Sequence, residues 1–431
     1  MRLSEIAKLL NSELIGEDRE IKGFSTDSRT INEGELFIAL KGEKFNGEDF
    51  TEEALSKGAV GCIVSESFNK NLRQIIKVKN PLNALIGLAK YYRDKYLNET
   101  NIIAIGGAVG KTTTKEMLFK VFSNFYKTYK SPKSYNNHIG VPLTILNTPK
   151  EAQFLILEIG TNHIGEVEFL VDIAKPRYAI LTNIEVEHIE FFKSIENIAI
   201  EESNIFKFAD VGFIRKEDYL KFSNIIKKPQ KIITFDINDY KYEFLEIGVR
   251  LFLNDDYVDF INYGWLENAI CVMKVCEFFN IKEPYKFLKN FKSESMRMEI
   301  LKINDFEIIN DAYNSNPASF KALLYSIRPS KKNLFIIGDM LELGEFSEFY
   351  HRQIGKYILE LKHDNFIFVG NFVKWTYDEL KGKINCYYFD SKEKAFEFLK
   401  NYSKTFKRII LKASRGMKFE DFIENVKDWS S

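Results

Sequence analysis

The feature that most constrains the fold is an alternation of short apolar runs with longer stretches of helical periodicity. Seven runs are strand candidates: NIIAI (101–105), FLILEI (154–159), YAILTN (178–183), FEIIND (306–311), LFIIGD (334–339), FIFVG (366–370) and RIILKA (408–413). Such alternation is typical of parallel sheets whose two faces are covered by helices. The sequence therefore predicts an α/β fold for the middle and the end of the chain.

Polar residues stand where many of these apolar runs stop. They are Glu158, Asn183, Asp311, Asp339 and Lys412. In open α/β sheets, ligands bind outside the carboxyl ends of the strands. We therefore expect these side chains to lie where a ligand binds.

The first run leads into a glycine-rich loop and then into a predicted helix. The loop has the spacing GxxGKT over Gly107–Thr112, and Ile105 stands where the longer GxxxxGK[ST] pattern has its first glycine. One face of the helix is expected to carry Met117, Leu118, Val121, Phe122 and Phe125. This strand, loop and helix are the context that a phosphate-binding loop requires.

The residue types of this phosphate loop suit a nucleotide. Glycines let backbone N–H groups approach phosphate oxygens, and the start of the helix adds partial positive charge. Lys111 can neutralise the terminal phosphates, and the Thr112 hydroxyl can bind Mg²⁺. The predicted ATP-binding segment is Gly107, Ala108, Val109, Gly110, Lys111, Thr112 and Thr113. The alternative is a glycine-rich turn without a ligand.

Length and charge set the number of domains and the class of partner. A chain of 431 residues, at roughly 150 residues per domain, is expected to form about three domains. We predict boundaries at 1–80, 81–292 and 293–431, because the first part has short strands (LFIAL, GCIVS, RQIIKV) and turn-rich connections. Lys and Arg number 61 and Asp and Glu also 61, so nothing favours a nucleic acid as the partner.

The sequence also favours a cytoplasmic setting. The first residues, MRLSEIAKLLNSEL, have helical periodicity and lack the pattern of a secretion signal. No apolar run reaches the roughly 20 residues that would cross a bilayer. Four cysteines without CxxC spacing are expected to be buried thiols in a reducing compartment.

Six further segments follow the phosphate loop in a fixed order. They are SYNNHIGVPLT (134–144), LEIGTNHIGEV (157–167), LTNIEVEHIEFFKSIENIA (181–199), NDAYNSNPASF (310–320), IIGDMLELGEFS (336–347) and LKASRG (411–416). Together with GGAVGKTTTKEM they closely resemble the Mur ligases, and DAYNSNP and GDMLELG resemble the MurF branch. STDSRTINEGELFIALKGEKFNGEDF is similar to the family's uridine-nucleotide-binding segment. The resemblance covers nearly the whole chain.

The resemblance implies an architecture and an activity. The expected fold has a small N-terminal α/β uridine-binding domain, a central P-loop ATPase domain with a mostly parallel sheet, and a C-terminal Rossmann-like domain. The implied enzyme is an ATP- and Mg²⁺-dependent ligase. It would add D-alanyl-D-alanine to UDP-N-acetylmuramoyl-tripeptide through an acyl phosphate. A monomer is expected, and no membrane span.

The resemblance also implies catalytic and metal-binding residues. Lys111, Glu158 and His188 match catalytic positions, and Thr112, Glu158 and His188 match metal-binding ones. The chain departs from the family at Glu202, because the pattern usually has a lysine there that becomes carbamylated. We hypothesise that the Glu202 carboxylate replaces the carbamate. The alternative is an exposed helix glutamate and a weakly held second metal.

Further positions match the family's nucleotide and substrate sites. Asn268, Arg297 and Asp311 are the implied nucleotide-binding residues outside the loop. The implied substrate residues are Asp27, Ser28 and Arg29 for uridine, Asn136, Asn137 and His138 for the region of the γ-phosphate and tripeptide, Tyr313, Asn314 and Asn316 for the dipeptide, and Lys412 and Arg415 for a carboxylate or the acyl phosphate. For DSR, NNH and NSNP, an ordinary turn or structural loop is the alternative.

Two other functions remain open at this point. One is a related amide ligase that adds an amino acid, and the other is a nucleotide-binding protein without ligase activity. The sequence does not distinguish meso-diaminopimelate from lysine as the last residue of the tripeptide.

Overall fold

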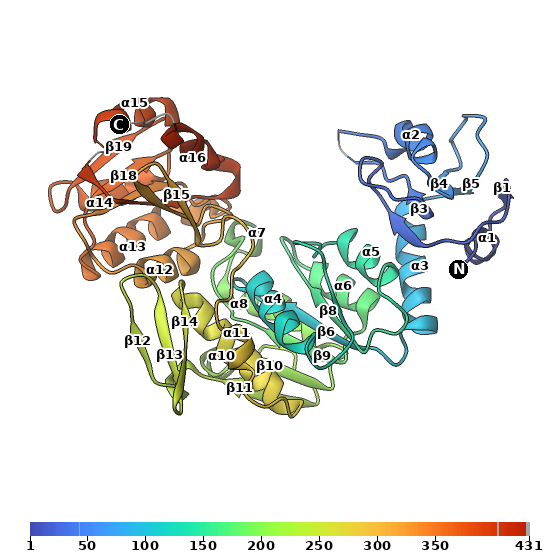
Figure 1. Cartoon of the computed structure of the whole chain (residues 1–431), viewed down its shortest axis with the longest axis horizontal. Helices are drawn as coiled ribbons and strands as arrows, with labels where there is room; N and C mark the ends of the chain where they lie inside the picture. The colour runs from blue at the N-terminus through green and yellow to red at the C-terminus, as the bar shows by residue number, and fades with distance from the viewer. Residues whose placement is uncertain (43, 403–404, 428–431) are drawn as a thin grey trace. The chain divides into compact units, whose positions relative to one another are not determined.

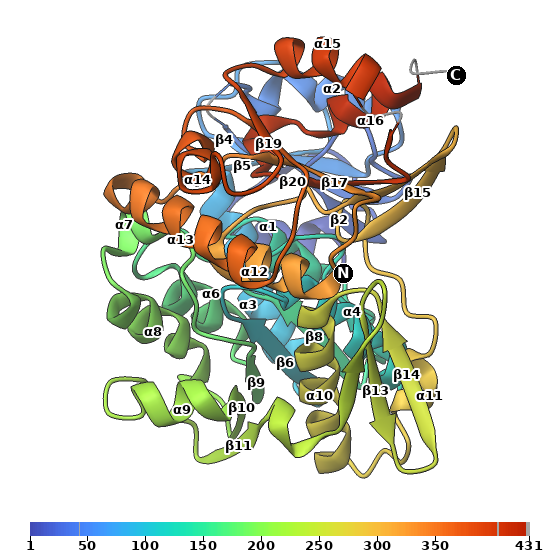
Figure 2. The ribbon, with the colours of Figure 1, turned by 90° about the vertical axis from the view of Figure 1, so that its left-hand side faces the viewer.

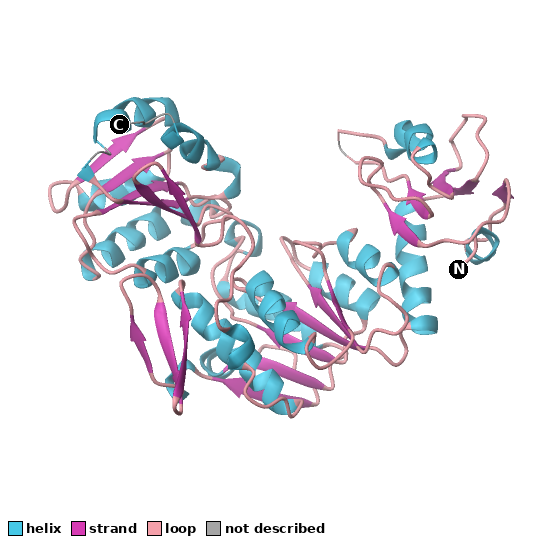
Figure 3. Cartoon of the chain, in the orientation of Figure 1, coloured by secondary structure: helices cyan, strands magenta, loops and turns pink. Residues whose placement is uncertain are grey.

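A computed structural model describes residues 1–42, 44–402 and 405–427. The chain forms two compact units. One unit contains Met1–Ala104, Phe125–Gly160 and Val167–Tyr178, and the other contains Ile105–Asn124, Thr161–Glu166 and Ala179–Ser431. Figure 1 labels the elements along the chain, and Figure 3 shows helices and strands throughout both units.

The first unit begins with a five-stranded sheet of order β1-β5-β4-β3-β2. Its strands are β1 (Leu14–Ile15), β2 (Gly23–Ser25), β3 (Glu35–Ile38), β4 (Gly61–Ser65) and β5 (Ile75–Val78). Neighbouring strands pair in parallel except β1 and β5. Helices α1 (Leu3–Leu9) and α2 (Thr51–Ser56) belong to this part. Phe37, Cys62, Val64 and Ile75 contribute to its core. The predicted α/β character of this part is confirmed, whereas its boundary at residue 80 stays a prediction.

Helix α3 (Pro81–Tyr96) follows this sheet, and Asn80 and Pro81 form its start. The Asn80 side chain accepts hydrogen bonds from the N–H groups of Leu82 and Asn83, and Pro81 occupies the first helical turn. An Asn cap followed by proline is a strong helix start, because it satisfies free N–H groups and presets the backbone.

The remainder of the first unit contains β7 (Thr128–Lys130), α5 (Gly140–Leu146), β8 (Phe154–Glu158) and most of α6 (Glu166–Ala174). Asn147, at the end of α5, is bonded to both backbone groups of Phe24 in the edge strand β2. Its Oδ1 accepts from the Phe24 N–H at 2.9 Å, and its Nδ2 donates to the Phe24 carbonyl at 2.9 Å. The amide thus satisfies backbone groups that an edge strand leaves unpaired.

A six-stranded sheet has the order β11-β10-β9-β6-β8-β7. Its remaining strands are β6 (Asn101–Gly106), β9 (Tyr178–Leu181), β10 (Val211–Arg215) and β11 (Lys231–Phe235). Strands β10 and β11 pair in parallel, as do β7 and β8. This sheet contains three of the predicted strands.

Helix α4 (Lys111–Phe122) follows β6 through the phosphate loop. Met117, Leu118, Val121 and Phe122 are fully buried, as predicted. The prediction for Phe125 was wrong: it lies beyond the end of the helix and is 48% exposed. Apolar residues continue at helical spacing beyond Phe122, but helix α4 ends at that residue.

A three-stranded antiparallel sheet in the second unit was not predicted. It consists of β12 (Tyr242–Phe244), β13 (Val249–Leu253) and β14 (Asp256–Phe260). Helix α10 (Tyr263–Phe278) contacts β13 and β14 (Figure 2). Asn254, with φ 52°, begins the two-residue connection between β13 and β14. Asparagine tolerates this left-handed conformation in a tight turn, so Asn254 between two β-prone runs favours a turn at this position.

The last part of the chain forms a sheet of order β15-β16-β20-β17-β18-β19. Only β15 pairs antiparallel. The strands are β15 (Glu299–Ile303), β16 (Phe306–Asn310), β17 (Asn333–Gly338), β18 (Phe366–Val369), β19 (Cys386–Phe389) and β20 (Arg408–Lys412). The accompanying helices are α12 (Pro317–Ser326), α13 (Ser347–Glu360), α14 (Val373–Leu380), α15 (Lys392–Tyr402) and α16 (Glu420–Lys427).

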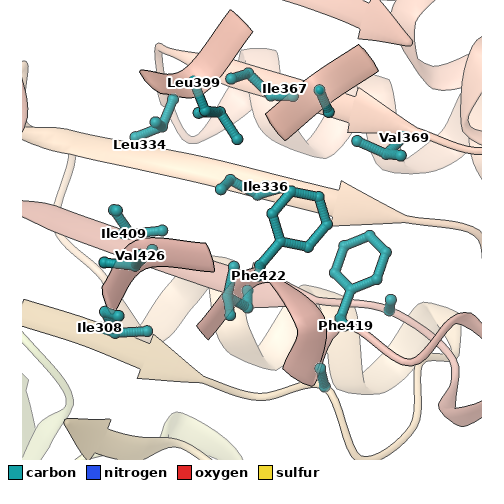
Figure 4. Packing of buried hydrophobic residues seen from close by; sticks show 14 of the residues in the cluster. Ile308, Leu334, Ile336, Ile367, Val369, Leu399, Ile409, Phe419, Phe422 and Val426 are labelled. Carbon is teal, nitrogen blue, oxygen red and sulfur yellow. The ribbon is translucent and has the colours of Figure 1, made fainter. Parts of the chain in front are cut away.

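Apolar side chains of α15 and α16 pack against this sheet (Figure 4). Leu399 and Phe422 belong to the same buried cluster as Ile336 of β17 and Ile409 of β20. Burying side chains of this size is the main favourable term in folding. Every strand predicted from an apolar run is therefore present, and the α/β fold is confirmed.

Two remaining expectations concern cysteines and the membrane. Cys62, Cys271 and Cys276 are buried, and Cys386 is partly buried. Among the described residues, no helix combines the length and apolarity needed to span a bilayer.

Candidate nucleotide site and its surroundings

Two glycines of the phosphate loop have backbone conformations that exclude a side chain. Gly107 has φ 110° and Gly110 has φ 89°. A Cβ atom on Gly107 would overlap Thr182 Oγ1, and one on Gly110 would overlap the amide of Asn268. Glycine is therefore required at both positions by conformation and by space. Helix α4 begins directly after Gly110, so its N-terminus faces the loop, as anion binding requires.

The residues after β9 support the loop from one side. Asn183 Oδ1 accepts from the Val109 N–H at 3.0 Å, and Asn183 Nδ2 donates to the Val109 carbonyl at 2.9 Å. Thr182 Oγ1 donates to the same carbonyl at 2.7 Å. Asn183 was predicted to lie at a ligand-binding edge, and its amide holds the loop there.

Glu202 supports the loop from the buried side. It comes from α8 (Ile195–Ser203), is 3% exposed, and its Oε2 accepts from the Gly107 N–H at 2.8 Å. Burial raises the pKa of Glu202 to about 7, although Lys111 opposes this rise. The alternative of an exposed helix glutamate is thus wrong, because the side chain is buried against the loop. Metal binding by Glu202 stays a hypothesis.

The neighbouring Glu201 is equally buried but serves another segment. Its Oε2 accepts from the Gly165 N–H at 2.9 Å and from Asn204 Nδ2 at 3.2 Å. The two adjacent glutamates of α8 therefore have different partners, and Glu202 is the one bonded to Gly107 of the phosphate loop.

Lys111 is bonded to the backbone of the loop. Its Nζ donates to the Gly107 carbonyl at 2.6 Å and lies 3.2 Å from Glu187 Oε2. Glu187 also approaches His188, with 3.7 Å between Glu187 Oε1 and His188 Nε2. Sequence reasoning missed Glu187, although it directly precedes the predicted histidine.

His188 is paired with a residue from the GDMLELG segment. Its Nδ1 lies 2.6 Å from Glu342 Oε2. Burial acts to lower the pKa of His188, but Glu342 and Glu187 outweigh it and the pKa is raised. The hydrogen bond from His188 lowers the pKa of Glu342.

Two predicted nucleotide residues outside the loop lie against it. Asn268 is buried on α10 beside Gly110. Arg297 Nη2 donates to Thr112 Oγ1 at 3.3 Å, and its guanidinium lies 3.9 Å from the centre of the Tyr313 ring. Asn268 and Arg297, from two distant segments of the chain, thus lie near the start of α4.

Asp311 and Lys412 form a buried ion pair with each other. Lys412 Nζ lies 2.8 Å from Asp311 Oδ2 and donates to the Asn314 carbonyl at 2.9 Å. The side chain of Lys412 is 2% exposed, and that of Asp311 is 12% exposed. The Met298 N–H donates to Asp311 Oδ1 at 3.1 Å. Both carboxylate oxygens are engaged, so in this state the pair holds β20 to the segment after β16.

The other predicted residues of the last sheet have local partners. Asn316 caps α12, with Oδ1 accepting from the Ser319 N–H at 2.8 Å in a capping box. Asn314 Oδ1 accepts from the next N–H in the chain at 2.9 Å. Arg415 is half-exposed and lies 2.8 Å from Glu420. NSNP thus leads into the start of α12 rather than forming a separate turn, and substrate binding there stays a prediction.

In the first unit, Glu158 ends β8 and is 2% exposed. Asn136 Nδ2 donates to Glu158 Oε1 at 3.0 Å, and the Glu158 N–H donates to Ser131 Oγ at 3.1 Å. Asn137 Oδ1 accepts from the N–H of Gly140, the first residue of α5, at 2.9 Å. His138 is exposed. Asn136 and Glu158 are therefore brought together, whereas Asn137 has a structural role.

The predicted uridine segment forms a compact turn. Arg29 lies 2.7 Å from Asp27 Oδ2, with its side chain 82% exposed. Hydrogen bonding from Arg29 lowers the pKa of Asp27 to about 2. Ser28 is buried and donates to Glu53 at 3.0 Å. The geometry is that of a surface turn, and uridine binding remains a prediction.

The donor set is compatible with Mg²⁺ but does not form a protein cage. Within the described ranges, no three His, Cys, Asp or Glu side chains are grouped to hold a metal ion. Mg²⁺ usually keeps several waters and takes one or two carboxylates plus substrate phosphates. Thr112, the second residue of α4, is 2% exposed. In the first unit, Glu158 ends β8 and is also 2% exposed. A hydroxyl and a carboxylate are oxygen donors of the type that Mg²⁺ prefers.

Three family models match successive parts of the chain. They describe the Mur ligase family catalytic domain (20–93), the Mur ligase middle domain (105–281) and the Mur ligase glutamate ligase domain (296–415). A protein of Rickettsia prowazekii is 31% identical, with 92% of this chain and 93% of that protein covered. A protein of Bacillus subtilis is 31% identical, with 98% of each covered. Both are named UDP-N-acetylmuramoyl-tripeptide--D-alanyl-D-alanine ligase.

Solved structures agree with the family models. MurF from Acinetobacter baumannii has a TM-score of 0.84 at 24% identity, covering 99% of this chain and 98% of that one. MurF ligase from Thermotoga maritima in complex with ADP has a TM-score of 0.80 at 26% identity, covering 95% and 97%. The first structure supports the fold. The second shows the same fold in a relative that was solved with bound ADP. Given these matches along nearly its whole length, the chain belongs to the Mur ligase family, in its MurF branch.

Proposed function

We propose that this chain is the ligase that joins D-alanyl-D-alanine to UDP-N-acetylmuramoyl-tripeptide. The γ-phosphoryl group of ATP is transferred to the tripeptide's terminal carboxylate, giving an acyl phosphate and ADP. The amine of the dipeptide then attacks the acyl carbon, and phosphate leaves with the bonding electrons. The product is the UDP-linked pentapeptide used in peptidoglycan synthesis. The observation that carries this proposal is the phosphate loop, in a chain 31% identical to ligases of that name.

Lys111 and Arg297 are the proposed cations of the phosphoryl-transfer step. Phosphoryl transfer depends mainly on alignment and on stabilising charge in the transferred group. Lys111 lies on the loop itself, and Arg297 reaches Thr112 at the start of α4. With a nucleotide bound, Lys111 would exchange its bond to the Gly107 carbonyl for phosphate oxygens. Asn268 and Asp311 complete the proposed nucleotide set.

Thr112, Glu158 and His188 are the residues that would hold Mg²⁺. Bound Mg²⁺ neutralises charge on the phosphate oxygens during transfer. Glu202 supplies a fixed carboxylate where the family's carbamate is expected. It also orients the Gly107 N–H by accepting its hydrogen bond. The glutamate requires no carbon dioxide to become anionic.

The substrate ends of the site are proposed from matching positions. Asp27, Ser28 and Arg29 would receive the uridine nucleotide. Asn136, Asn137 and His138 would face the tripeptide and γ-phosphate. The proposed dipeptide residues are Tyr313, Asn314, Asn316, Lys412 and Arg415. For Lys412, carboxylate binding would require its ion pair with Asp311 to open. We also propose a cytoplasmic location, since ATP and the UDP-linked substrate are both cytoplasmic metabolites. The proposed monomeric state rests on the resemblance to the family.

A phosphate-release assay tests the proposal directly. Release should require ATP, Mg²⁺, UDP-N-acetylmuramoyl-tripeptide and D-alanyl-D-alanine together, and Lys111→Ala should abolish it. A panel of single amino acids in place of the dipeptide would detect the related ligase activity. Tripeptides ending in meso-diaminopimelate or lysine would identify the preferred substrate. The proposal is wrong if authentic substrates give no phosphate release above that of Lys111→Ala.

A further inference from the structure

The segment after β17 contacts the start of α7 (Ile189–Phe192) closely. The Glu190 N–H donates to the Glu342 carbonyl at 3.3 Å. A Cβ atom on Gly344, which has φ 51°, would lie 2.8 Å from Glu190 Cγ and 3.4 Å from Glu190 Cα. A larger residue at this left-handed position would be strained, and it would force the Glu190 side chain to move. The GDMLELG segment is thus fitted to the element that carries His188.

The central contact joins two residues with unusual backbone conformations. Glu342 has φ 63° and His188 has φ 50°. Left-handed backbone in non-glycine residues costs on the order of 1 kcal/mol and is kept where the surroundings enforce it. The side chains of these two residues meet at 2.6 Å, between Glu342 Oε2 and His188 Nδ1.

This contact continues to the phosphate loop. Glu187 Oε1 lies 3.7 Å from His188 Nε2, and Glu187 Oε2 lies 3.2 Å from Lys111 Nζ. Lys111 in turn donates to the Gly107 carbonyl at 2.6 Å. A connected set of polar contacts therefore runs from Glu342 through His188 and Glu187 to Lys111.

A carboxylate faces each ring nitrogen of His188, and Glu342 is the nearer of the two, at 2.6 Å from Nδ1 compared with 3.7 Å between Glu187 and Nε2. A neutral imidazole has one N–H, and a carboxylate next to Nδ1 favours the proton on that nitrogen. Nε2 then presents its lone pair, which is the form that binds a metal. Carboxylate partners of metal-binding histidines fix both the tautomer and the orientation of the ring.

We propose that Glu342 is a positioning residue for His188, and that it ties the GDMLELG segment to the phosphoryl-transfer site. The inference rests on the proposed role of His188 as a Mg²⁺ ligand. Glu342 touches neither substrate nor nucleotide in this role. It holds the His188 ring so that Nε2 is available to a metal. This orientation of the ring requires the segment after β17 to be packed against α7.

The energy of the ion pair alone does not account for this arrangement. The Glu342 side chain is 50% exposed, and pairs exposed to that degree contribute little to stability. Two left-handed residues and a closely fitted glycine surround the pair. The arrangement therefore fits a role in orienting His188 better than a role in stability.

Nitrogen NMR of the whole ligand-free chain tests the tautomer. Histidine ring ¹⁵N shifts would be recorded at alkaline pH, where imidazoles are neutral, and His188 would be assigned by its loss in His188→Gln. We expect the Nδ1–H tautomer of His188 in the unsubstituted protein, and a shift toward Nε2–H in Glu342→Ala. Glu342→Gln should retain the original tautomer, because its amide oxygen still accepts a hydrogen bond.

Glu345→Ala is the matched control, since it removes an exposed carboxylate from the same segment. Unchanged His188 signals in Glu342→Ala, or an equal change in Glu345→Ala, would overturn the proposal. If Glu342→Ala fails to fold, Glu342→Asp replaces it, because the shorter side chain withdraws the carboxylate while keeping its charge.

Mg²⁺ dependence provides the second measurement. Loss of a metal ligand's partner typically costs 10- to 100-fold in metal affinity or activity, so we expect the half-saturating Mg²⁺ concentration to rise about 10-fold in Glu342→Ala and not in Glu345→Ala. An unaltered Mg²⁺ requirement would refute the link to the metal. If the unsubstituted chain lacks ligase activity, the proposed function fails, while the NMR result still decides the contact between Glu342 and His188.

Discussion

Glu202→Gln separates the cost of burying a carboxylate from its benefit to the phosphate loop. Glutamine keeps the shape and an oxygen that can accept the Gly107 N–H, but it cannot ionise. Burial raises the pKa of Glu202 to about 7 in the folded chain. The unfolded chain has an ordinary glutamate, which loses its proton near pH 4.5. The two states therefore bind different numbers of protons between these values.

The sign of the effect follows from that difference. Between pH 4.5 and about 7 the folded chain holds a proton that the unfolded chain has released, so stability falls as pH rises. At 1.36 kcal/mol per pH unit, the loss is about 3 kcal/mol and is complete above pH 7. Glu202→Gln should lack this loss and be more stable than the unsubstituted chain above pH 7, but about equally stable below pH 4.5.

Thermal unfolding with EDTA measures this difference. A change of about 3 kcal/mol corresponds to on the order of 5 °C or more in a unit of this size. Glu196→Gln is the control, because Glu196 is exposed on the same helix. Parallel pH profiles for Glu202→Gln and the unsubstituted chain would refute the reasoning about burial. In the ligase assay the same substitution should lower turnover and raise the Mg²⁺ requirement. If both remain unchanged, Glu202 does not replace the carbamate.

Three further predictions concern other contacts. Gly110→Ala should reduce ATP binding at least 10-fold by isothermal titration, since a Cβ there overlaps Asn268 and the backbone is left-handed; full binding would contradict the requirement for glycine. Lys412→Met should cost about 3–5 kcal/mol in denaturant unfolding, because it leaves Asp311 buried without its charge partner; adding Asp311→Asn should recover much of the loss, and no recovery would refute the pairing argument. Burial lowers the pKa of His351 below its ordinary value of 6.5. The unfolded chain therefore binds a proton at this residue more readily, and the free energy of unfolding should decline as the pH falls below about 6.5. His351→Gln should show a smaller decline in thermal unfolding, and an identical decline would argue against this residue.

Local sequence determined most of the individual elements. Apolar runs predicted the strands that end in Glu158 and Lys412 and the strand that Asp311 follows, because burial on both faces of a parallel sheet demands continuous apolar residues. The glycines of the phosphate loop could also be interpreted from local sequence, since positive φ angles of this size favour glycine strongly over other residues. Asn254 favours a turn within the missed sheet.

The contacts between elements were decided only by the tertiary structure. Glu202 and Gly107 lie 95 positions apart and are joined by a hydrogen bond, and Asp311 and Lys412 lie 101 apart and form an ion pair. No periodicity in the chain encodes such pairs, because they depend on how helices and strands pack in space. Motifs in the sequence supplied the chemistry of the site, whereas packing assigned each charged side chain its partner.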